Sequence, residues 1–281
     1  MELGIVAQKG NDRATSVASA VVDALEDDGV DVLVDEATAS AIGAQGVPTT
    51  ALADCAFVVS VGGDGTFLYA ARHVGTTPIL GVNLGEVGFL NAVPPGDAVD
   101  AVRAEVAQVR ERGEPRYREV PRVVARGADW SLPPGLNEVG VFGPRRGRGG
   151  GLDIEVRVDG EAFAAGHADG VLVATPTGST AYNLAEDGPL VHPSVDALVV
   201  NLMNPAQRTP PLVVGRDSVV TVRADAAPHA VVASDGSARR RLEPPGEVEA
   251  GVHPEPGRIA GPPTEFFRAL EKLEGPTRDG P

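Results

Sequence analysis

One stretch, residues 56–73, constrains the fold of this chain more than any other. An apolar run, 56–61, leads into three glycines around one carboxylate, Gly62-Gly63-Asp64-Gly65-Thr66, and a helix-like segment follows as far as His73. This order predicts a buried strand, a tight turn and a helix. A sheet in which strands are followed by helices provides such a junction, so the stretch favours an α/β fold.

The turn itself is suited to binding phosphate. Glycines let backbone N–H groups come close to a ligand, and the start of a helix favours negative charge. Asp64 is the exception, because a carboxylate repels phosphate. Its presence indicates that this side chain takes up a proton or binds a ribose hydroxyl or a metal ion. The alternative is that Gly-Gly-Asp-Gly is only a turn, since Gly and Asp tolerate positive φ.

Strands and helices alternate through the first 112 residues. Apolar runs predict strands at 3–7, 31–35 and 78–83, and helical spacing predicts helices at 13–25 and 97–112, the first capped by Asn11 or Asp12. The alanine-rich segment 37–53 is ambiguous. The alternation predicts a mostly parallel sheet covered by helices, with ligands bound at the carboxyl ends of the strands.

The pattern changes near Gly113, after which short strands and turns predict a β-rich, sandwich-like domain. The predicted strands are 120–126, 137–142, 152–159, 170–174, 197–203, 212–222 and 230–233. A terminal helix over 263–273, with an apolar stripe from Phe266 to Leu273, is expected to return to the first domain. The predicted domains are therefore 1–112, 113–258 and 259–281.

Composition excludes several classes of function. The chain has 39 Asp and Glu against 24 Lys and Arg, a net charge of −15, which disfavours nucleic acid as a partner. One cysteine, Cys55, excludes an internal disulfide framework, and no apolar stretch is long enough for a membrane helix. We expect a cytoplasmic protein with no membrane partner, adapted to a salt-rich cytoplasm in which screening removes the self-repulsion of an acidic surface.

Further stretches carry polar groups suited to a nucleotide. Asn137-Glu138 offers an amide for an adenine or ribose edge beside a carboxylate that accepts from hydroxyls. Residues 169–182 run from an acidic turn through a buried strand into the hydroxyl-rich turn 175–180, followed by Tyr182. Ser234-Asp235-Gly236 is another carboxylate turn. Each has a structural alternative: an exposed strand end, a helix cap or a simple turn.

Other catalytic arrangements do not match the sequence. The five histidines lack paired metal-ligand spacing, and Ser179 does not lie in a nucleophile elbow. Neither a P-loop nor a dinucleotide-binding glycine fingerprint is present. Phosphate binding therefore depends on the Gly-Gly-Asp-Gly turn. The basic loop Arg145–Gly151 is either a phosphate-contacting arm or a long hairpin tip.

In order and spacing these stretches resemble the NAD kinase family. The resemblance rests on Gly62–Thr66, Gly85–Phe89, Asn137-Glu138, Asp169-Gly170 with Thr175–Tyr182, and Asp235. It implies an α/β first domain, a β-rich domain that binds NAD, and a homodimer or homotetramer. The implied reaction is transfer of a phosphoryl group from ATP or polyphosphate, with Mg²⁺ or another divalent cation, to the 2′-hydroxyl of the adenosine ribose of NAD, giving NADP.

The resemblance also implies roles for individual residues. Asp64 would contact or deprotonate the 2′-hydroxyl and is the implied catalytic residue, in a pocket expected between the two domains. The remaining implied residues fall into two sets. The phosphate-donor residues are Gly62, Gly63, Gly65 and Thr66, and the NAD-binding residues, besides Asp64, are Phe89, Asn137, Glu138, Asp169, Thr177, Thr180, Ala181, Tyr182 and Asp235.

Two departures from the family pattern leave alternatives open. His167-Ala168 stands where Arg-Gly is common, and Asn204-Pro205 where Pro-His is common. They leave open a non-catalytic nucleotide-binding regulator. A lipid or sugar kinase with the same glycine motif is the other alternative, although it would not require both Asn137-Glu138 and Thr175–Tyr182.

The acidic composition generates a testable prediction. We expect the midpoint of thermal unfolding, followed by circular dichroism, to rise as KCl is raised, because salt screens the repulsion among 39 acidic side chains. A midpoint that is constant or falls with KCl would contradict adaptation to a salt-rich cytoplasm.

Overall fold

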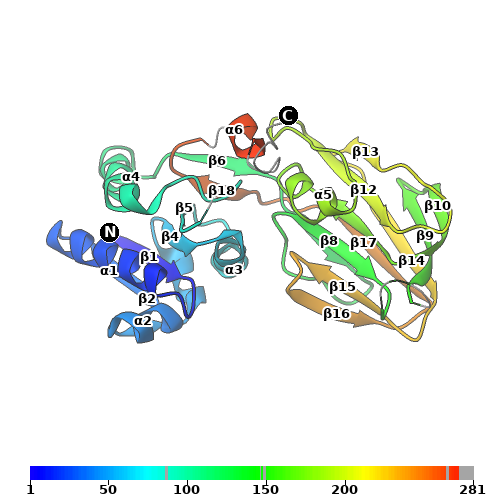
Figure 1. Ribbon diagram of the computed structural model, residues 1–281, viewed down its shortest axis with the longest axis horizontal. Helices are drawn as coiled ribbons and strands as arrows, with labels where there is room; N and C mark the ends of the chain where they lie inside the picture. The colour runs from blue at the N-terminus through cyan, green and yellow to red at the C-terminus, as the bar shows by residue number, and fades with distance from the viewer. Residues whose placement is uncertain (86–87, 146, 148–149, 264–265, 272–281) are drawn as a thin grey trace, which may run out of the picture. The chain divides into compact units, whose positions relative to one another are not determined.

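The chain forms two compact units (Figure 1). The computed structural model describes residues 1–85, 88–145, 147, 150–263 and 266–271. Unit 1 comprises Met1–Glu119 and Gly257–Pro281, and unit 2 comprises Val120–Pro256. Parts of three predicted features lie outside the described residues: Glu86 and Val87 of the second turn, Arg146, Arg148 and Gly149 of the basic loop, and residues 264–265 and 272–273 of the terminal helix.

Unit 1 is built on a seven-stranded sheet. Its order is β3-β2-β1-β4-β5-β18-β6, and every pairing from β3 through to β18 is parallel. The strands are β1 (Glu2–Ala7), β2 (Asp31–Asp35), β3 (Gly46–Val47), β4 (Val58–Gly62), β5 (Ile79–Asn83), β6 (Tyr117–Val120) and β18 (Gly257–Ala260). Because β6 and β18 both join this sheet, the chain passes into unit 2 at Val120 rather than near Gly113.

Helices cover this sheet. Buried residues of α1 (Asp12–Asp27), α2 (Glu36–Ile42) and α4 (Ala98–Arg112) share one apolar core with β1, β4 and β5, while α3 (Asp64–Val74) packs against β4 and β5. Asn11 caps α1, and its side chain accepts from the backbone N–H groups of Arg13 and Ala14. The ambiguous segment 37–53 divides among α2, β3 and a 3₁₀ helix, Thr49–Asp54. A second 3₁₀ turn (Pro95–Asp97) precedes α4, and α6 (Phe266–Leu270) is the last helix described.

Parallel pairing brings three chain segments together at the carboxyl ends of the strands. Ala7 at the end of β1 lies opposite Val61, and Gly62 at the end of β4 lies opposite Asn83 at the end of β5. The carboxyl ends of parallel strands all point the same way, so the segments that follow β1, β4 and β5 meet there. The glycine turn is the middle one of the three.

Unit 2 is a sandwich of two antiparallel sheets. One has five strands in the order β10-β9-β14-β17-β7, and the other has six in the order β13-β12-β11-β8-β15-β16. Buried valines, leucines and alanines from both sheets form a single core. The strands are β7 (Val123–Arg126), β8 (Glu138–Phe142), β9 (Leu152–Val158), β10 (Glu161–Ala168), β11 (Gly170–Ala174), β12 (Ala197–Met203), β13 (Leu212–Gly215), β14 (Val220–Ala226), β15 (Ala230–Ser234), β16 (Ala238–Leu242) and β17 (Gly246–Val252).

The β-rich, sandwich-like prediction for this part of the chain is confirmed, with corrections in detail. The strand predicted over 212–222 is two strands, β13 and β14, which belong to different sheets. The strand β17, which lies between β14 and β7, was not predicted. The strands β10 and β16 were not predicted either. They lie at sheet edges, where alanines in one case and three consecutive arginines in the other replace the apolar alternation of a half-buried strand.

Candidate active site

The glycines of the turn between β4 and α3 have different surroundings. A Cβ atom on Gly62 would overlap the Thr66 side chain, whereas one on Gly63 or Gly65 would meet no protein atom within 4 Å. Gly63 has an ordinary extended backbone, φ −92°, and all three glycines lie outside the positive-φ region. The turn alternative does not explain Gly63 or Gly65, because neither a left-handed conformation nor packing requires them. Their bare backbone leaves room for a ligand beside the start of α3.

Asp64 is the first residue of α3, and its carboxylate is largely withdrawn from water. It accepts a hydrogen bond from the Asn91 side-chain amide at 2.9 Å, and the backbone N–H groups of Leu90, Phe89 and Asn91 also point to it. Burial raises the pKa of Asp64 above its usual range, and these hydrogen bonds to the ionised form lower it in part. A carboxylate with a raised pKa is suited to accepting a proton near neutral pH.

Asn91 was missed by sequence reasoning. Its side chain is fully buried, and it fits against β5 because a Cβ on Gly81 would overlap it. Gly88 likewise leaves room for the Asp64 carboxylate. The sequence did contain one indication of its role. An asparagine directly follows Gly88-Phe89-Leu90, in the segment after the predicted strand 78–83.

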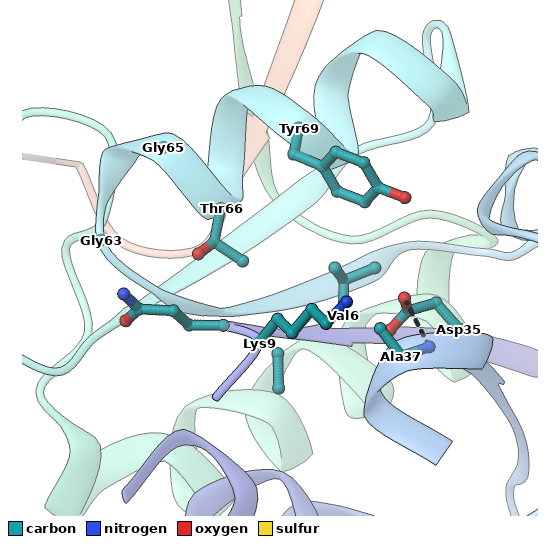
Figure 2. A pocket seen from close by; sticks show the side chains of 10 residues that line it. Val6, Lys9, Asp35, Ala37, Gly63, Gly65, Thr66 and Tyr69 are labelled. Atoms are coloured by element: carbon teal, nitrogen blue, oxygen red, sulfur yellow. Dashed lines mark hydrogen bonds between the residues drawn. The ribbon is translucent and has the colours of Figure 1, made fainter. Parts of the chain in front are cut away.

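A cavity of about 470 Å³ lies beside the glycine turn within unit 1 (Figure 2). Gly63, Gly65, Thr66 and Tyr69 line it from the α3 side, and Figure 2 shows the Lys9 side chain extended across it. Lys9 was also missed, although lysine occurs at only two positions in the sequence. The remaining lining residues are Val6, Ala7, Gln8, Asp35 and Ala37.

In unit 2, the Asp235 carboxylate organises the start of β8. Its two oxygens accept from the backbone N–H groups of Leu136 at 2.9 Å, Asn137 at 2.8 Å and Glu138 at 3.2 Å. A Cβ on Gly135 would overlap this carboxylate, and Asp235 itself has a positive φ of 44°. Asp235 therefore holds the backbone on which Asn137 and Glu138 are mounted.

Glu138 is 7% exposed and lines a cavity of about 320 Å³ together with Phe142, Tyr182 and Arg239. One of its carboxyl oxygens, Oε2, has no hydrogen-bond partner among the described residues. Burial and the nearby Asp235 carboxylate raise the pKa of Glu138 to about 8. The side chain is therefore mainly a neutral acid at pH 7, which can donate as well as accept a hydrogen bond.

The hydroxyl-rich turn after β11 is partly structural. Thr175 and Ser179 are fully buried, and their hydroxyls bond to the backbone of Leu136 and of Pro176 and Val191. The helix expected here is a 3₁₀ turn (Gly178–Thr180) followed by the four-residue α5 (Tyr182–Ala185). Thr177, Thr180, Ala181 and Tyr182 are half-buried on this turn.

The turn lies against Asn137. The Asn137 carbonyl accepts from the Thr175 N–H at 2.9 Å, and a Cβ on Gly178 would overlap that carbonyl. Asn137, Glu138 and the segment 175–182 therefore form one cluster at one end of the paired strands β8 and β11.

Asp169 lies at the other end of β11 from this cluster. Glu138 pairs with Ala174, whereas Asp169 precedes Gly170, which pairs with Phe142. The Asp169 carboxylate accepts from the Gly147 N–H at 3.0 Å and from the Asn204 side-chain amide at 3.4 Å. One of the two departures from the family pattern thus contacts Asp169 directly.

The other departure, His167-Ala168, combines a bridging side chain with a core residue. Both ring nitrogens of His167 are within hydrogen-bond distance of oxygens, Asp153 Oδ1 at 2.9 Å and the Gly150 carbonyl at 2.8 Å. These two acceptors raise the pKa of His167, because only the protonated ring donates to both. Ala168 is buried in the core of unit 2.

The predicted site residues fall into two groups, one in each unit. Unit 1 brings the glycine turn and Asp64 together with the 88–91 segment, which carries Phe89, and the Phe89 ring lies 6.0 Å from that of Phe266. Unit 2 contains the other predicted residues, with Asp169 apart from the rest. Among the described residues, no group of three His, Cys, Asp or Glu side chains could hold a metal ion, and no described helix could span a membrane.

Comparison with protein families matches most of the chain. Residues 3–109 match the ATP-NAD kinase N-terminal domain, and residues 137–256 match the ATP-NAD kinase C-terminal domain. The two matched segments include the glycine turn, Asn91, Asn137-Glu138 and Asp235.

The similar proteins are named NAD kinase or NADH kinase. The chain is 57% identical over 282 residues to an NAD kinase of Halobacterium salinarum, covering 98% of this chain and all of the relative, and 54% identical to one of Haloarcula marismortui, covering 97% and all of it. Among solved structures, an Archaeoglobus fulgidus NAD kinase in complex with ATP is 26% identical with a TM-score of 0.76, over 97% of this chain and 98% of that one. Yeast NADH kinase complexed with NADH, 20% identical, shares the fold with a TM-score of 0.86 over all of this chain and 89% of that one. With both domains matched and more than half the residues identical to full-length relatives, this chain belongs to the NAD kinase family.

Proposed function

We propose that this protein transfers the γ-phosphoryl group of ATP to the 2′-hydroxyl of the adenosine ribose of NAD, giving NADP and ADP. The observation that carries the proposal is Asp64, a carboxylate with a raised pKa at the start of α3, next to two glycines whose backbone is open to a ligand. The names of the similar proteins supply the substrates, NAD and ATP.

The chemistry follows from this arrangement. The backbone N–H groups of Gly63 and Gly65 hold the phosphates of the donor, because the start of an eleven-residue helix favours negative charge. The Thr66 N–H donates to the Gly63 carbonyl at 3.0 Å and closes the turn. Asp64 accepts the proton of the 2′-hydroxyl as that oxygen forms a bond to the γ-phosphorus and the bond to the ADP oxygen breaks. Phosphoryl transfer depends mainly on positioning and charge neutralisation, so a single well-placed carboxylate is sufficient protein chemistry.

The residues of unit 2 bind the nucleoside of NAD in this proposal. Asn137 and Glu138 provide the polar contacts, and Asp235 acts through them by fixing their backbone. The half-buried positions on the turn after β11 line the same site, and Asp169 reaches a more distant part of the dinucleotide. Phe89 supplies an aromatic contact from unit 1. The lining positions on the turn are Thr177, Thr180, Ala181 and Tyr182.

A divalent cation, Mg²⁺ in the first instance, accompanies the donor. Magnesium is commonly held by one or two carboxylates together with substrate phosphates, and in this proposal it arrives with ATP. Its contribution is neutralisation of phosphate charge. Cytoplasmic location and assembly into a homodimer or homotetramer belong to the same proposal, and light scattering on the purified protein in high KCl measures the assembly.

The direct test is an assay of purified protein in high KCl with Mg-ATP and NAD. We expect NADP to form, measured with an NADP-specific dehydrogenase. Binding of NAD without formation of NADP would contradict the kinase proposal and favour a nucleotide-binding regulator, and phosphorylation of a lipid or sugar instead would favour another kinase of the same glycine motif.

Asp64 and Asn91 can be tested together. We expect Asp64→Asn to fold and bind NAD but to lose about 10²- to 10⁴-fold in kcat, the usual contribution of a general base. In the wild type, kcat should fall as pH is lowered through the raised pKa of Asp64, because the protonated acid accepts no proton.

Asn91→Ala removes a hydrogen bond that favours the ionised form of Asp64, so the acidic limb of the kcat profile should move to higher pH. Near-normal turnover of Asp64→Asn would show that Asp64 does not accept the proton. An acidic limb at the same pH in Asn91→Ala and in the wild type would show that Asn91 does not lower the pKa of the catalytic base.

Glu138 predicts a second pH effect, on binding. Below about pH 8 Glu138 is neutral, and above it the buried carboxylate becomes charged beside Asp235 and no longer donates a hydrogen bond. The KM for NAD should therefore rise as pH increases through about 8 in the wild type but not in Glu138→Gln. Glu161→Gln, an exposed position on edge strand β10, is the matched control and should keep the wild-type profile. A KM with the same pH dependence in Glu138→Gln and in the wild type would contradict this assignment.

A further inference from the structure

We propose that Ser60, in the middle of β4, is a positioning residue for the reaction: its hydroxyl donates to the side-chain oxygen of Asn91 and thereby turns the Asn91 amide group toward Asp64. This inference rests on the proposed function, because Asp64 is the base whose hydrogen-bond donor Ser60 holds in place. Ser60 is fully buried, so it acts through Asn91 and not on a substrate.

Ser60 is the one polar side chain on an apolar strand. All five residues of β4 are buried, and the other four are three valines and a glycine. The Ser60 side chain is 0% exposed, and its Oγ atom has no hydrogen-bond partner among the described residues. Strands buried on both faces are normally apolar throughout, and a buried hydroxyl without a partner costs stability. A serine at this position therefore requires a polar group beside it.

The Asn91 amide has an acceptor that matches this donor. Its Nδ2 atom donates to Asp64 Oδ1 at 2.9 Å, while its Oδ1 atom is buried and has no partner within the part of the chain that the structure describes. The oxygen and nitrogen of an amide are nearly equal in shape, so packing alone does not decide which of them faces Asp64. An oxygen facing the ionised carboxylate would be repelled by it. A donor on the far side of the amide selects the orientation that Asp64 requires.

The pairing of β4 with β5 brings Ser60 next to this oxygen. Ser60 lies opposite Gly81 in the parallel register, so the two positions face the same side of the sheet. A Cβ on Gly81 would overlap Asn91 Oδ1, which therefore occupies the space over the glycine. Neighbouring strands are about 4.8 Å apart, so the Ser60 Cβ lies roughly 5 Å from the oxygen. A hydroxyl spans such a separation through a small shift of the side chains or through one buried water molecule.

Ser60 faces the side of the sheet on which α3 lies. Gly62 is two residues further along β4 and faces the same side, and a Cβ there would overlap the side chain of Thr66 on α3. The residues paired with Ser60 are Val6 on β1 and Gly81 on β5, and neither carries a polar side chain. The amide oxygen over Gly81 is therefore the acceptor next to the serine hydroxyl.

The consequence for Asp64 is electrostatic. Burial raises its pKa, and the hydrogen bonds from the Asn91 side chain and from the backbone N–H groups of 89–91 lower it, with no charged side chain of a described residue among the causes. Without the Ser60 hydroxyl, the amide can turn its oxygen toward Asp64, so the ionised carboxylate loses a donor and its pKa rises further. Ser60 thus helps to keep the base ionised at lower pH.

The first test is the pH profile of kcat with saturating Mg-ATP and NAD. Ser60→Ala should move the acidic limb to higher pH by about half a unit to one unit, less than complete loss of a hydrogen bond to a charged group, and should leave both KM values close to the wild type. Ser60→Thr keeps the hydroxyl and should restore the wild-type limb. Thr77→Val is the matched control, because it removes another buried hydroxyl of unit 1, one that donates to the Ala53 carbonyl, and should leave the limb in place.

Because Ser60 acts through Asn91, the effects of the two substitutions should not add. Asn91→Ala moves the limb by itself, and the double variant, Ser60→Ala with Asn91→Ala, should move it no further. An unshifted limb in Ser60→Ala, or additive shifts in the double variant, would overturn the inference while leaving the kinase function intact.

Thermal unfolding of the same four proteins, followed by circular dichroism, tests the contact even if no NADP forms. Ser60→Ala should lower the midpoint by about 2–4 °C in the wild-type background and by clearly less in the Asn91→Ala background. Such coupling supports the contact between Ser60 and Asn91 whether or not the protein is a kinase. Equal losses in both backgrounds would refute it.

Discussion

A carboxylate withdrawn from water remains useful as a base only if other dipoles replace the water, and the arrangement of unit 1 around Asp64 meets that condition. The dipoles come from the segment after β5, through the Asn91 amide and the backbone N–H groups of 89–91. They reach Asp64 because β4 and β5 are neighbouring parallel strands that end at the same edge. Gly81 and Gly88 provide the space, since a Cβ on either would overlap Asn91 or Asp64.

In unit 2, polar groups first stabilise the backbone, and only the remaining ones are available to a ligand. Asp235 uses both carboxyl oxygens on the backbone before β8, and Thr175 and Ser179 use their hydroxyls within the turn after β11. Glu138 differs, because it is buried with one oxygen that has no partner among the described residues. A buried polar group without a partner costs stability, and in the proposed function the bound nucleoside supplies that partner.

The sequence predicted the α/β and β-rich halves and the glycine turn, because apolar periodicity and glycine spacing are local signals. It did not predict Asn91 or Lys9, because their importance comes from the pairing of β5 with β4 and from the end of β1 lying beside α3. Thr175 and Ser179 looked like ligand groups in the sequence, and only their burial shows that the fold uses them. The edge strand β16, with its three arginines, lacked the apolar pattern from which strands are recognised.

The place of β18 in the first sheet has a consequence for how the chain is made. Residues 257–260 lie between β5 and β6, so the sheet of unit 1 has a gap until almost the whole chain has left the ribosome. Unit 2 is one continuous segment, Val120–Pro256, and all of it is synthesised before β18. The glycine turn emerges early, but the sheet that supports it is completed last. Synthesis thus favours completion of unit 2 before that of unit 1, the reverse of the order in which the two units begin in the sequence.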